Sequence, residues 1–321
     1  MPQLIKLYHT GEIMSTLFSH FFTKINQISP LEHVFTEVLE SIALKPKTLY
    51  FHGKMPENMS KNNKMERPKT VAIVGSRHNT RYGEEIAYEM AYELAKRGVI
   101  VVSGLAYGID SIAHKGALDA DGCTVAVLGT PIDQIYPRAH EKLAKDIIAQ
   151  GGAIISELEP GAKFYPKTSF LKRNRIIAGL SDAVVIVEAA VRSGSLNTAA
   201  HALEQGKDVF AVPGNITSPY SMGCNKLIRQ GASPYTCLDD LLSALFPEEF
   251  VRRHNEAALK VLAADTKEEA AILQALLRGL RTGEEIIEFT QLNAPVFSQF
   301  ITLLEIKGQV RALGGNHWSL M

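Results

Sequence analysis

The segment Ala162–Arg175 combines side chains that could hold a nucleic-acid strand. Its sequence, AKFYPKTSFLKRNR, contains five cations and three aromatic residues and no acid. The cations are Lys163, Lys167, Lys172, Arg173 and Arg175, and the aromatic residues are Phe164, Tyr165 and Phe170. Cations that follow a backbone and aromatic rings that stack on bases are the combination a single-strand groove uses. The simpler alternative is a solvated basic helix start with aromatic rings packed beneath it. Basic charge at a helix N-terminus costs roughly 0.3–1 kcal/mol, which is easier to explain if an anion binds there.

Glycines and serines form a second group, because they follow short apolar runs along the chain. Gly75, Ser76 and Arg77 follow the first run, and the segment 103–110, which includes Gly104, follows the second. Later runs lead into Ser193, Gly194 and Ser195 and into the segment 213–215. Such turns expose backbone N–H groups, and a helix N-terminus behind them favours an anion. Any one of these glycines could serve turn geometry alone, but their recurrence predicts phosphate binding.

The signatures of several enzyme classes are missing from these loops. The next glycine after Gly75 is Gly83, and no clear acidic residue ends the second run, so we expect no dinucleotide cofactor. We find no G-x-x-x-x-G-K-[ST], H-E-x-x-H, G-x-S-x-G or paired-cysteine signature. We therefore expect no cofactor, no metal and no catalytic residue. Asp110 is predicted to cap the helix that starts at Ser111.

The elements that position these loops follow from the apolar pattern. Continuous β-branched runs, typical of strands buried on both faces, lie at 71–74, 99–102, 124–128, 153–155, 183–187 and 208–212. Helical spacing appears between them, as in Glu84–Arg97, which Gly98 is placed to terminate. Repeated strand–helix units predict the α/β class, with an extended Rossmann-like, doubly wound and mostly parallel sheet.

The flanks of this domain have different patterns. Residues 1–66 are predicted to form an N-terminal extension and linker, and 67–247 to form the Rossmann-like domain. A linker over 248–267 then leads to a small domain over 268–321. The small domain is predicted to hold helices at 271–277, 284–289 and 295–306, followed by a hairpin around Gly314, which is a winged-helix pattern. Its four cations and six acids give −2, which favours a protein contact over duplex DNA.

Whole-chain composition limits the location of any nucleic-acid site. The 321 residues contain 34 Lys plus Arg and 34 Asp plus Glu, so such a site must be a local patch. The 3 cysteines are too few and too scattered for a disulfide framework and fit a reducing cytosol. No signal peptide or apolar run of membrane-spanning length is apparent. We therefore expect a soluble cytoplasmic protein.

Six segments in order resemble the DprA/Smf family of bacterial DNA-processing proteins. They are VAIVGSR (71–77), SGLAYGID (103–110), FLKRNRIIAGLS (170–181), VVIVEA (184–189), SGSLNTAAHALEQGKDVFAVPG (193–214) and SMGCNKLIRQGA (221–232). The resemblance extends from about Leu39 to Leu242, and the tail at 303–320 is similar to the family's winged-helix domain. The region before about Leu31 departs from the N-terminal domain that many members carry.

The resemblance implies a single-stranded-DNA-binding recombination mediator without enzymatic activity. It also implies a homodimer that hands the strand to the recombinase RecA during natural transformation. The DNA-binding residues it implies are Gly75, Ser76, Arg77, Lys167, Phe170, Arg173, Asn174 and Arg175, bordered by Gly104, Ser193, Gly194 and Ser195. We expect Arg77, Lys167, Arg173 and Arg175 to neutralise phosphates, so that Arg175→Ala flattens the salt dependence of binding.

An enzyme is the competing hypothesis. Related Rossmann-like domains hydrolyse nucleoside monophosphates with a PGGxGTxxE loop. The nearest segment here, Val191–Ala199, lacks the double glycine and the glutamate in register. His201 lies nearby without an evident partner, and Glu204 is expected to face solvent. A purely structural interaction module would fit the acidic tail but not the five-cation segment.

Overall fold

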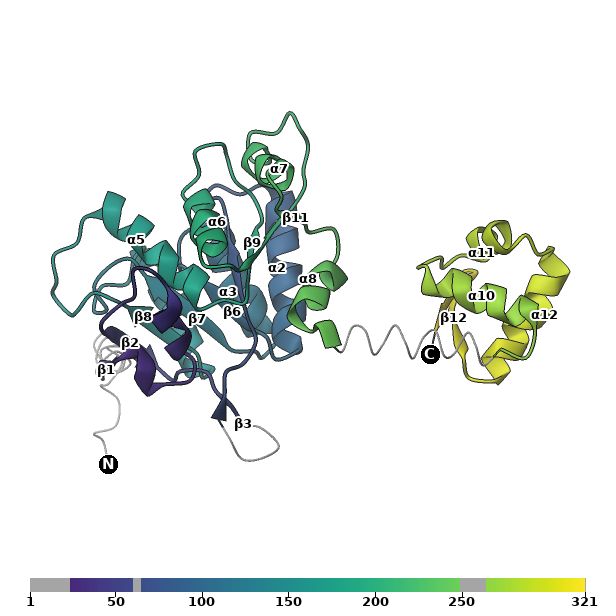
Figure 1. The fold of residues 1–321 in the computed structure, drawn as a ribbon, viewed down its shortest axis with the longest axis horizontal. Helices are drawn as coiled ribbons and strands as arrows, with labels where there is room; N and C mark the ends of the chain where they lie inside the picture. Colours follow the sequence, from purple (N-terminus) through teal and green to yellow (C-terminus); the bar gives the residue numbers. More distant parts are fainter. Residues whose placement is uncertain (1–23, 60–64, 249–263, 321) are drawn as a thin grey trace, which may run out of the picture. The chain divides into compact units, whose positions relative to one another are not determined.

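The computed structural model of the chain describes residues 24–59, 65–248 and 264–320. The chain forms two compact units, Met1–Leu245 and Phe246–Met321. The larger unit is built around a sheet with helices on its faces, and the smaller one is a helical unit with a hairpin (Figure 1). Among the described residues, no helix is long and apolar enough to span a membrane.

The larger unit contains a nine-stranded sheet with the order β1-β2-β8-β7-β6-β5-β9-β10-β11. Its strands are β1 (Asn26–Ile28), β2 (Leu49–Gly53), β5 (Thr70–Val74), β6 (Ile100–Ser103), β7 (Thr124–Leu128), β8 (Ala153–Ser156), β9 (Ala183–Ile186), β10 (Asp208–Ala211) and β11 (Ser233–Pro234). The strands from β8 to β11 in this order pair in parallel. This confirms the predicted doubly wound, mostly parallel fold, and it places the loops after the parallel strands along one edge of the sheet.

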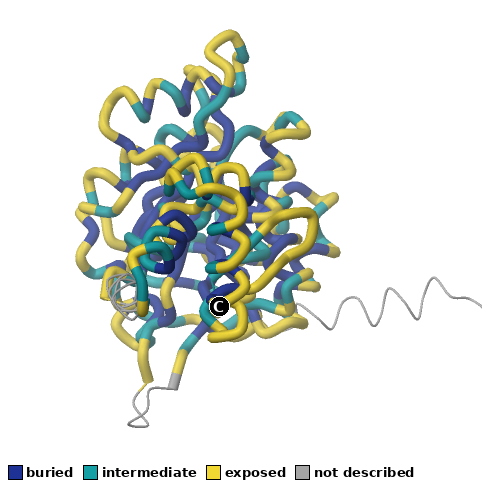
Figure 2. The backbone as a smooth tube through the Cα atoms, turned by 90° about the vertical axis from the view of Figure 1, so that its right-hand side faces the viewer, coloured by how far each residue is buried: buried dark blue, intermediate teal, exposed yellow. Residues whose placement is uncertain are grey.

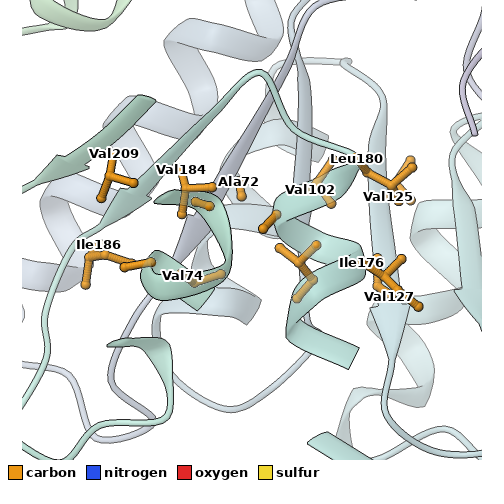
Figure 3. Packing of buried hydrophobic residues seen from close by; sticks show 14 of the residues in the cluster. Ala72, Val74, Val102, Val125, Val127, Ile176, Leu180, Val184, Ile186 and Val209 are labelled. Carbon is orange, nitrogen blue, oxygen red and sulfur yellow. The ribbon is translucent and has the colours of Figure 1, made fainter. Parts of the chain in front are cut away.

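Buried β-branched side chains explain why these segments are strands. Every residue of β5, β6, β7 and β9 is buried, as continuous apolar runs predict for a sheet covered on both faces. Val74, Val102 and Val127 from three strands belong to one core cluster with Ile176 of helix α5 (Pro166–Gly179) and Leu180, the residue that follows this helix (Figure 3). Figure 2 shows the buried backbone enclosed within an exposed outer layer. The sheet is therefore a rigid support for the loops at its edge.

The helices of the larger unit alternate with the parallel strands. They are α2 (Arg81–Lys96), α3 (Ile109–Asp119), α4 (Glu141–Ala149), α5 (Pro166–Gly179), α6 (Ser195–Glu204), α7 (Met222–Arg229) and α8 (Leu238–Leu245). Helix α2 begins where the Thr80 side chain accepts from the Gly83 amide. It ends before Gly98, whose φ of +76° is a conformation that glycine adopts without strain.

The N-terminal segment is part of the sheet, which differs from the expected domain boundary at residue 67. Strand β2 pairs antiparallel with β8, and β1 pairs antiparallel with β2. The apolar spacing in this region gives two short 3-10 helices, η1 (Pro30–Glu32) and η2 (Glu37–Ser41). Leu39 of η2, and Phe35 between the two helices, are buried in the main core. The expected loop at 56–68 contains the paired strands β3 (Asn58–Met59) and β4 (Met65–Glu66). Long-range pairing with β8 cannot be read from local periodicity.

The smaller unit has the predicted winged-helix order. It consists of α10 (Lys267–Leu277), α11 (Gly283–Thr290), α12 (Ala294–Ile306), β12 (Val310–Gly314) and β13 (His317–Leu320). Thr282 and Glu285 form a reciprocal capping box at the start of α11. Ile272, Phe297 and Leu304 are among the buried side chains that form the separate core of this unit. Most of the predicted linker at 248–267 lies outside the described residues.

Candidate nucleic-acid interface

A small cavity lies where the loops after β5, β6 and β7 meet helix α5. Its volume is about 30 Å³, and four chain segments contribute to its wall. The lining residues are Arg77, Gly104, Ala106, Tyr107, Tyr136, Pro137, Phe170 and Arg173. The cavity therefore brings together Arg77, Gly104, Phe170 and Arg173, which are four of the residues predicted from the sequence. It lies at the carboxyl ends of the strands, where open α/β sheets bind ligands.

The wall of this cavity is aromatic and carries one exposed cation. The Phe170 ring lies 5.5 Å from the Tyr136 ring, centroid to centroid, at an interplanar angle of 36°. The Arg77 guanidinium carbon lies 5.5 Å from the Phe170 centroid, within the range of a cation–π contact. A Cβ at Gly129 would lie 2.5 Å from the Phe170 ring, so only glycine leaves room for the ring there. This arrangement offers a base a π-face and its phosphate a cation.

The floor of the cavity includes the buried Arg173, which joins α5 to the loop after β6 and to β7. Arg173 donates to the backbone oxygens of Gly104, at 2.9 Å, and Val127. The Asp110 carboxylate accepts from the Gly104 amide at 3.0 Å. Burial raises the pKa of Asp110 and lowers the pKa of Arg173 to about 10, and the attraction between the two opposes both shifts. Arg173 is therefore charged at neutral pH and holds the loop in place.

Asp110 does not cap a helix, in contrast to the sequence-based expectation. Helix α3 begins at Ile109, two residues before the expected start at Ser111, and Gly108 occupies the N-cap position with a φ of +75° and a ψ of −130°. A Cβ at Gly108 would lie 2.3 Å from the Ser76 backbone oxygen. The close approach of the two loops therefore requires glycine, and it leaves the Asp110 side chain to bond Gly104.

The cations of the basic segment fall into two groups. Lys163, Lys167 and Lys172 are exposed, whereas Arg173 and Arg175 are buried. Both carboxylate oxygens of Glu157 accept from Arg175, at 2.6 and 2.8 Å. The structure thus differs from the prediction that the two arginines neutralise phosphates, because both guanidinium groups are engaged inside the protein. Only the exposed lysines of this segment remain available to a strand.

The other predicted residues border the cavity indirectly. Asn174 is buried and donates to the Gly194 backbone oxygen at 3.2 Å, so it connects α5 to the start of α6. The Ser193 and Ser195 hydroxyls bond each other at 2.7 Å. The backbone oxygen of Ser76, which follows Gly75, accepts from the Ile109 amide. These contacts order the loops, and none of Asn174, Ser193, Gly194 or Ser195 lines the cavity.

The crevice between β5 and β9, where a doubly wound sheet usually holds a nucleotide, is occupied by Glu188. This side chain is 2% exposed and accepts from both the Thr80 amide, at 2.8 Å, and the Thr80 hydroxyl, at 2.6 Å. A Cβ at Gly83 would lie 2.4 Å from the Glu188 carboxylate. Glu188 thus fills the crevice between β5 and β9, and its bonds to Thr80 fix the loop that carries Arg77. The open cavity lies instead beside β6 and β7.

Sequence reasoning missed three residues at this site. Tyr107 and Tyr136 line the cavity, and Arg138 lies two residues after Tyr136 with 94% of its side chain exposed. The first lies within the segment 103–110 that the sequence had already marked as a strand-end loop. The other two lie in the long loop after β7, whose approach to α5 has no local signal.

The buried His114 should make the free energy of unfolding depend on pH. Burial lowers the pKa of His114 to about 3, with His140 and Arg173 adding to the effect, against 6.5 in a model peptide. Its stabilising contribution is therefore complete above pH 6.5 and is lost as pH falls toward 3, by about 1.4 kcal/mol per pH unit. His114→Asn, which can still donate to the Thr124 hydroxyl that Nδ1 now contacts at 2.8 Å, should flatten this dependence.

Urea unfolding between pH 7.5 and 4.5, followed by circular dichroism, measures this effect. The only tryptophan, Trp318, lies in the smaller unit, so its fluorescence would report the wrong transition. An equal pH dependence in wild type and His114→Asn would show that other groups control acid stability.

Comparisons with known proteins extend these observations. Residues 26–246 match the family of DNA recombination-mediator protein A, and residues 256–316 match the DprA winged helix domain. The chain is 40% identical over 264 residues to a putative DNA processing protein DprA of Mycobacterium tuberculosis, covering 79% of this chain and 65% of that protein. The chain thus spans slightly less than two thirds of that relative.

Two solved structures have the same fold as the larger unit. DNA processing protein A of Streptococcus pneumoniae has a TM-score of 0.59 and 37% identity, over 71% of this chain and 77% of that one. The DNA processing protein A of Helicobacter pylori also has a TM-score of 0.59, with 31% identity over 72% and 98% of the two chains. The latter structure was described for a unique single-stranded DNA binding mode.

Proposed function

The chain belongs to the DNA recombination-mediator protein A family, and we propose that its larger unit binds single-stranded DNA at the cavity between Arg77, Tyr136 and Phe170. The placement of the Arg77 guanidinium over the Phe170 ring, at the mouth of an aromatic cavity, carries this proposal. A stacked base and its phosphate need these two groups side by side. The single-stranded DNA described for the Helicobacter pylori relative supports it.

Binding at this cavity is electrostatic and tolerant of sequence. Arg77 and Lys167 are exposed and contact phosphates, and Arg138 extends the charge along the loop beside Pro137. Phe170 stacks on a base, since every base has a π-face that an aromatic ring can accept. Arg173 and Arg175 shape the site from within and contact no phosphate.

Substitution of exposed and buried cations tests whether Arg77 and Lys167 contact phosphates while Arg175 does not. Arg77→Gln and Lys167→Gln should each reduce the slope of log affinity against log salt by about 0.7, since each removes one phosphate contact on a single strand. Arg175→Gln is the matched control, because it removes the same charge from a side chain that bonds Glu157. Its slope should equal that of the wild type.

Fluorescence anisotropy of labelled single-stranded and duplex oligonucleotides at several salt concentrations provides these slopes. Far-UV circular dichroism should establish that each variant is folded. Equal binding of single strands and duplexes, or an unchanged slope in Arg77→Gln and Lys167→Gln, would contradict a single-strand site at this cavity.

We further propose that the protein acts in the cytoplasm as a homodimer that delivers the strand to RecA during natural transformation. Support for this role comes from the recombination-mediator family to which the chain belongs. Light scattering of the full chain tests the dimer, since a mass of one 35.2 kDa subunit at micromolar concentration would contradict it. Pull-down of purified RecA, with and without single-stranded DNA, tests the partner.

The hydrolase alternative has less support, and we propose that the protein is not an enzyme. The candidate carboxylate, Glu204, is exposed on α6 and lies 3.2 Å from His201 in an ion-pair contact, and neither residue lines the cavity. Incubation with nucleoside monophosphates, followed by chromatography for released base, tests this alternative directly.

A further inference from the structure

A second hollow begins where the aromatic cavity ends. It lies between α3 and α4, has a volume of about 580 Å³, and has an apolar floor that includes Leu118 and Leu143. We call it the α3–α4 groove. Its size is much greater than that of the aromatic cavity, and none of the predicted DNA-binding residues lines it. The function proposed above therefore leaves this groove without a role.

His140 connects the two hollows. Its ring lines the α3–α4 groove and lies 5.0 Å from the Tyr107 ring, centroid to centroid, in an edge-on contact. Tyr107 in turn lines the aromatic cavity. Nδ1 of His140 lies 2.8 Å from the Leu105 backbone oxygen, which fixes the ring beside the loop after β6. A strand that leaves the cavity past Tyr107 therefore meets the α3–α4 groove first.

Charge is distributed unevenly along the groove. The two helices end side by side, because Gln150, just after α4, donates to the Leu118 backbone oxygen near the end of α3. Lys142 lies in the first turn of α4 and Lys115 lies on α3 before Leu118, so exposed cations occupy the half near His140. Asp146 and Asp119 lie farther toward the helix ends. Only the half next to the cavity favours an anion.

We propose that the α3–α4 groove is a second subsite for the same single strand, in which Lys115 and Lys142 bind phosphates of the nucleotides that follow the one in the aromatic cavity. This inference rests on the proposed function, since it extends the path of the strand that the cavity holds. Asp119 and Asp146 repel the backbone and end the path within the groove. The His140 ring lies under the strand at the crossing point.

A length series of oligothymidylates tests the subsite. The affinity of the wild type should keep rising with oligonucleotide length. The affinity of Lys115→Gln/Lys142→Gln should stop rising at a shorter length. With a long oligonucleotide, the double variant should also lose about 1.4 from the salt slope, which corresponds to two phosphates. Asp146→Asn should strengthen binding of the long oligonucleotide, because it removes repulsion at the end of the path.

Lys69→Gln/Lys96→Gln is the matched control, with the same charge change at exposed positions before β5 and at the end of α2, neither of which lines the groove. It should behave as wild type. If wild type binds but Lys115→Gln/Lys142→Gln has the same plateau length and slope, the subsite is refuted and the cavity proposal stands. If wild type prefers no single strand at any length, both proposals fail.

Discussion

Replacing Arg173 with methionine should lower the free energy of unfolding of the larger unit by about 3–5 kcal/mol, the usual cost of leaving a buried charge without a compensating one. The substitution leaves the Asp110 carboxylate buried without its cation. It also removes the donor to the backbone oxygens of Gly104 and Val127. Because native domains are stable by only about 5–15 kcal/mol, a loss of this size is readily measured by urea unfolding.

The same substitution should produce a distinctive pH dependence. Burial already raises the pKa of Asp110, and removal of Arg173 raises this pKa further. A carboxyl group whose pKa is raised on folding favours the folded state at low pH, and that contribution is lost as pH rises through the folded-state value. The loss in free energy of unfolding caused by Arg173→Met should therefore become smaller as the pH is lowered.

A second substitution separates the attraction between the Arg173 and Asp110 charges from the packing of the Arg173 side chain. Asp110→Asn in the Arg173→Met background removes the uncompensated charge, so it should recover part of the lost stability at pH 7.5 and abolish the extra pH dependence. A cost of less than about 1 kcal/mol for Arg173→Met would contradict the supporting role assigned to Arg173.

Replacing Phe170 with alanine should reduce the affinity for single-stranded DNA by about 5- to 150-fold, equivalent to the 1–3 kcal/mol of one base stacked on an aromatic ring. The salt slope should stay unchanged, because Phe170 carries no charge and the phosphate contacts of Arg77 and Lys167 remain. Competition anisotropy at two salt concentrations measures both quantities on the same samples.

Controls are needed because the Phe170 ring also packs against Gly129 and Tyr136. Phe170→Tyr retains a stacking face and should bind within a few-fold of wild type. Thermal unfolding of each variant reports whether the cavity wall has collapsed. A properly folded Phe170→Ala protein with wild-type affinity would rule out base stacking on this ring.

The two substitutions address residues that look alike in the sequence but act differently in the fold. Phe170 and Arg173 lie within one turn of α5, and both belong to the basic, aromatic segment that indicated strand binding. Phe170 points into the cavity wall, whereas Arg173 bonds the carbonyl of Val127 on β7. Only the packing of α5 on the sheet distinguishes a ligand-facing side chain from a supporting one.

The local sequence determined the sheet and the placement of its loops. Continuous apolar runs predicted β5 to β10 to within one residue at either end, because burial on both faces imposes the same residue types along each strand. Parallel strands share one carboxyl edge, so the loops at 75–77 and 103–110, which contain glycines and serines, lie along the same edge. The winged-helix order of the smaller unit also followed from local periodicity and the turn at Gly314-Gly315.

Tertiary structure decided which cations face solvent and where the sheet begins. Helix α5 is enclosed at its C-terminal half, so Arg173 bonds Val127, Asn174 bonds Gly194 and Arg175 bonds Glu157. Strand β2 joined β8 by long-range pairing, and Tyr136 reached Phe170 from a separate loop. Burial and these contacts depend on partners distant in the chain, and no pattern within α5 specifies them.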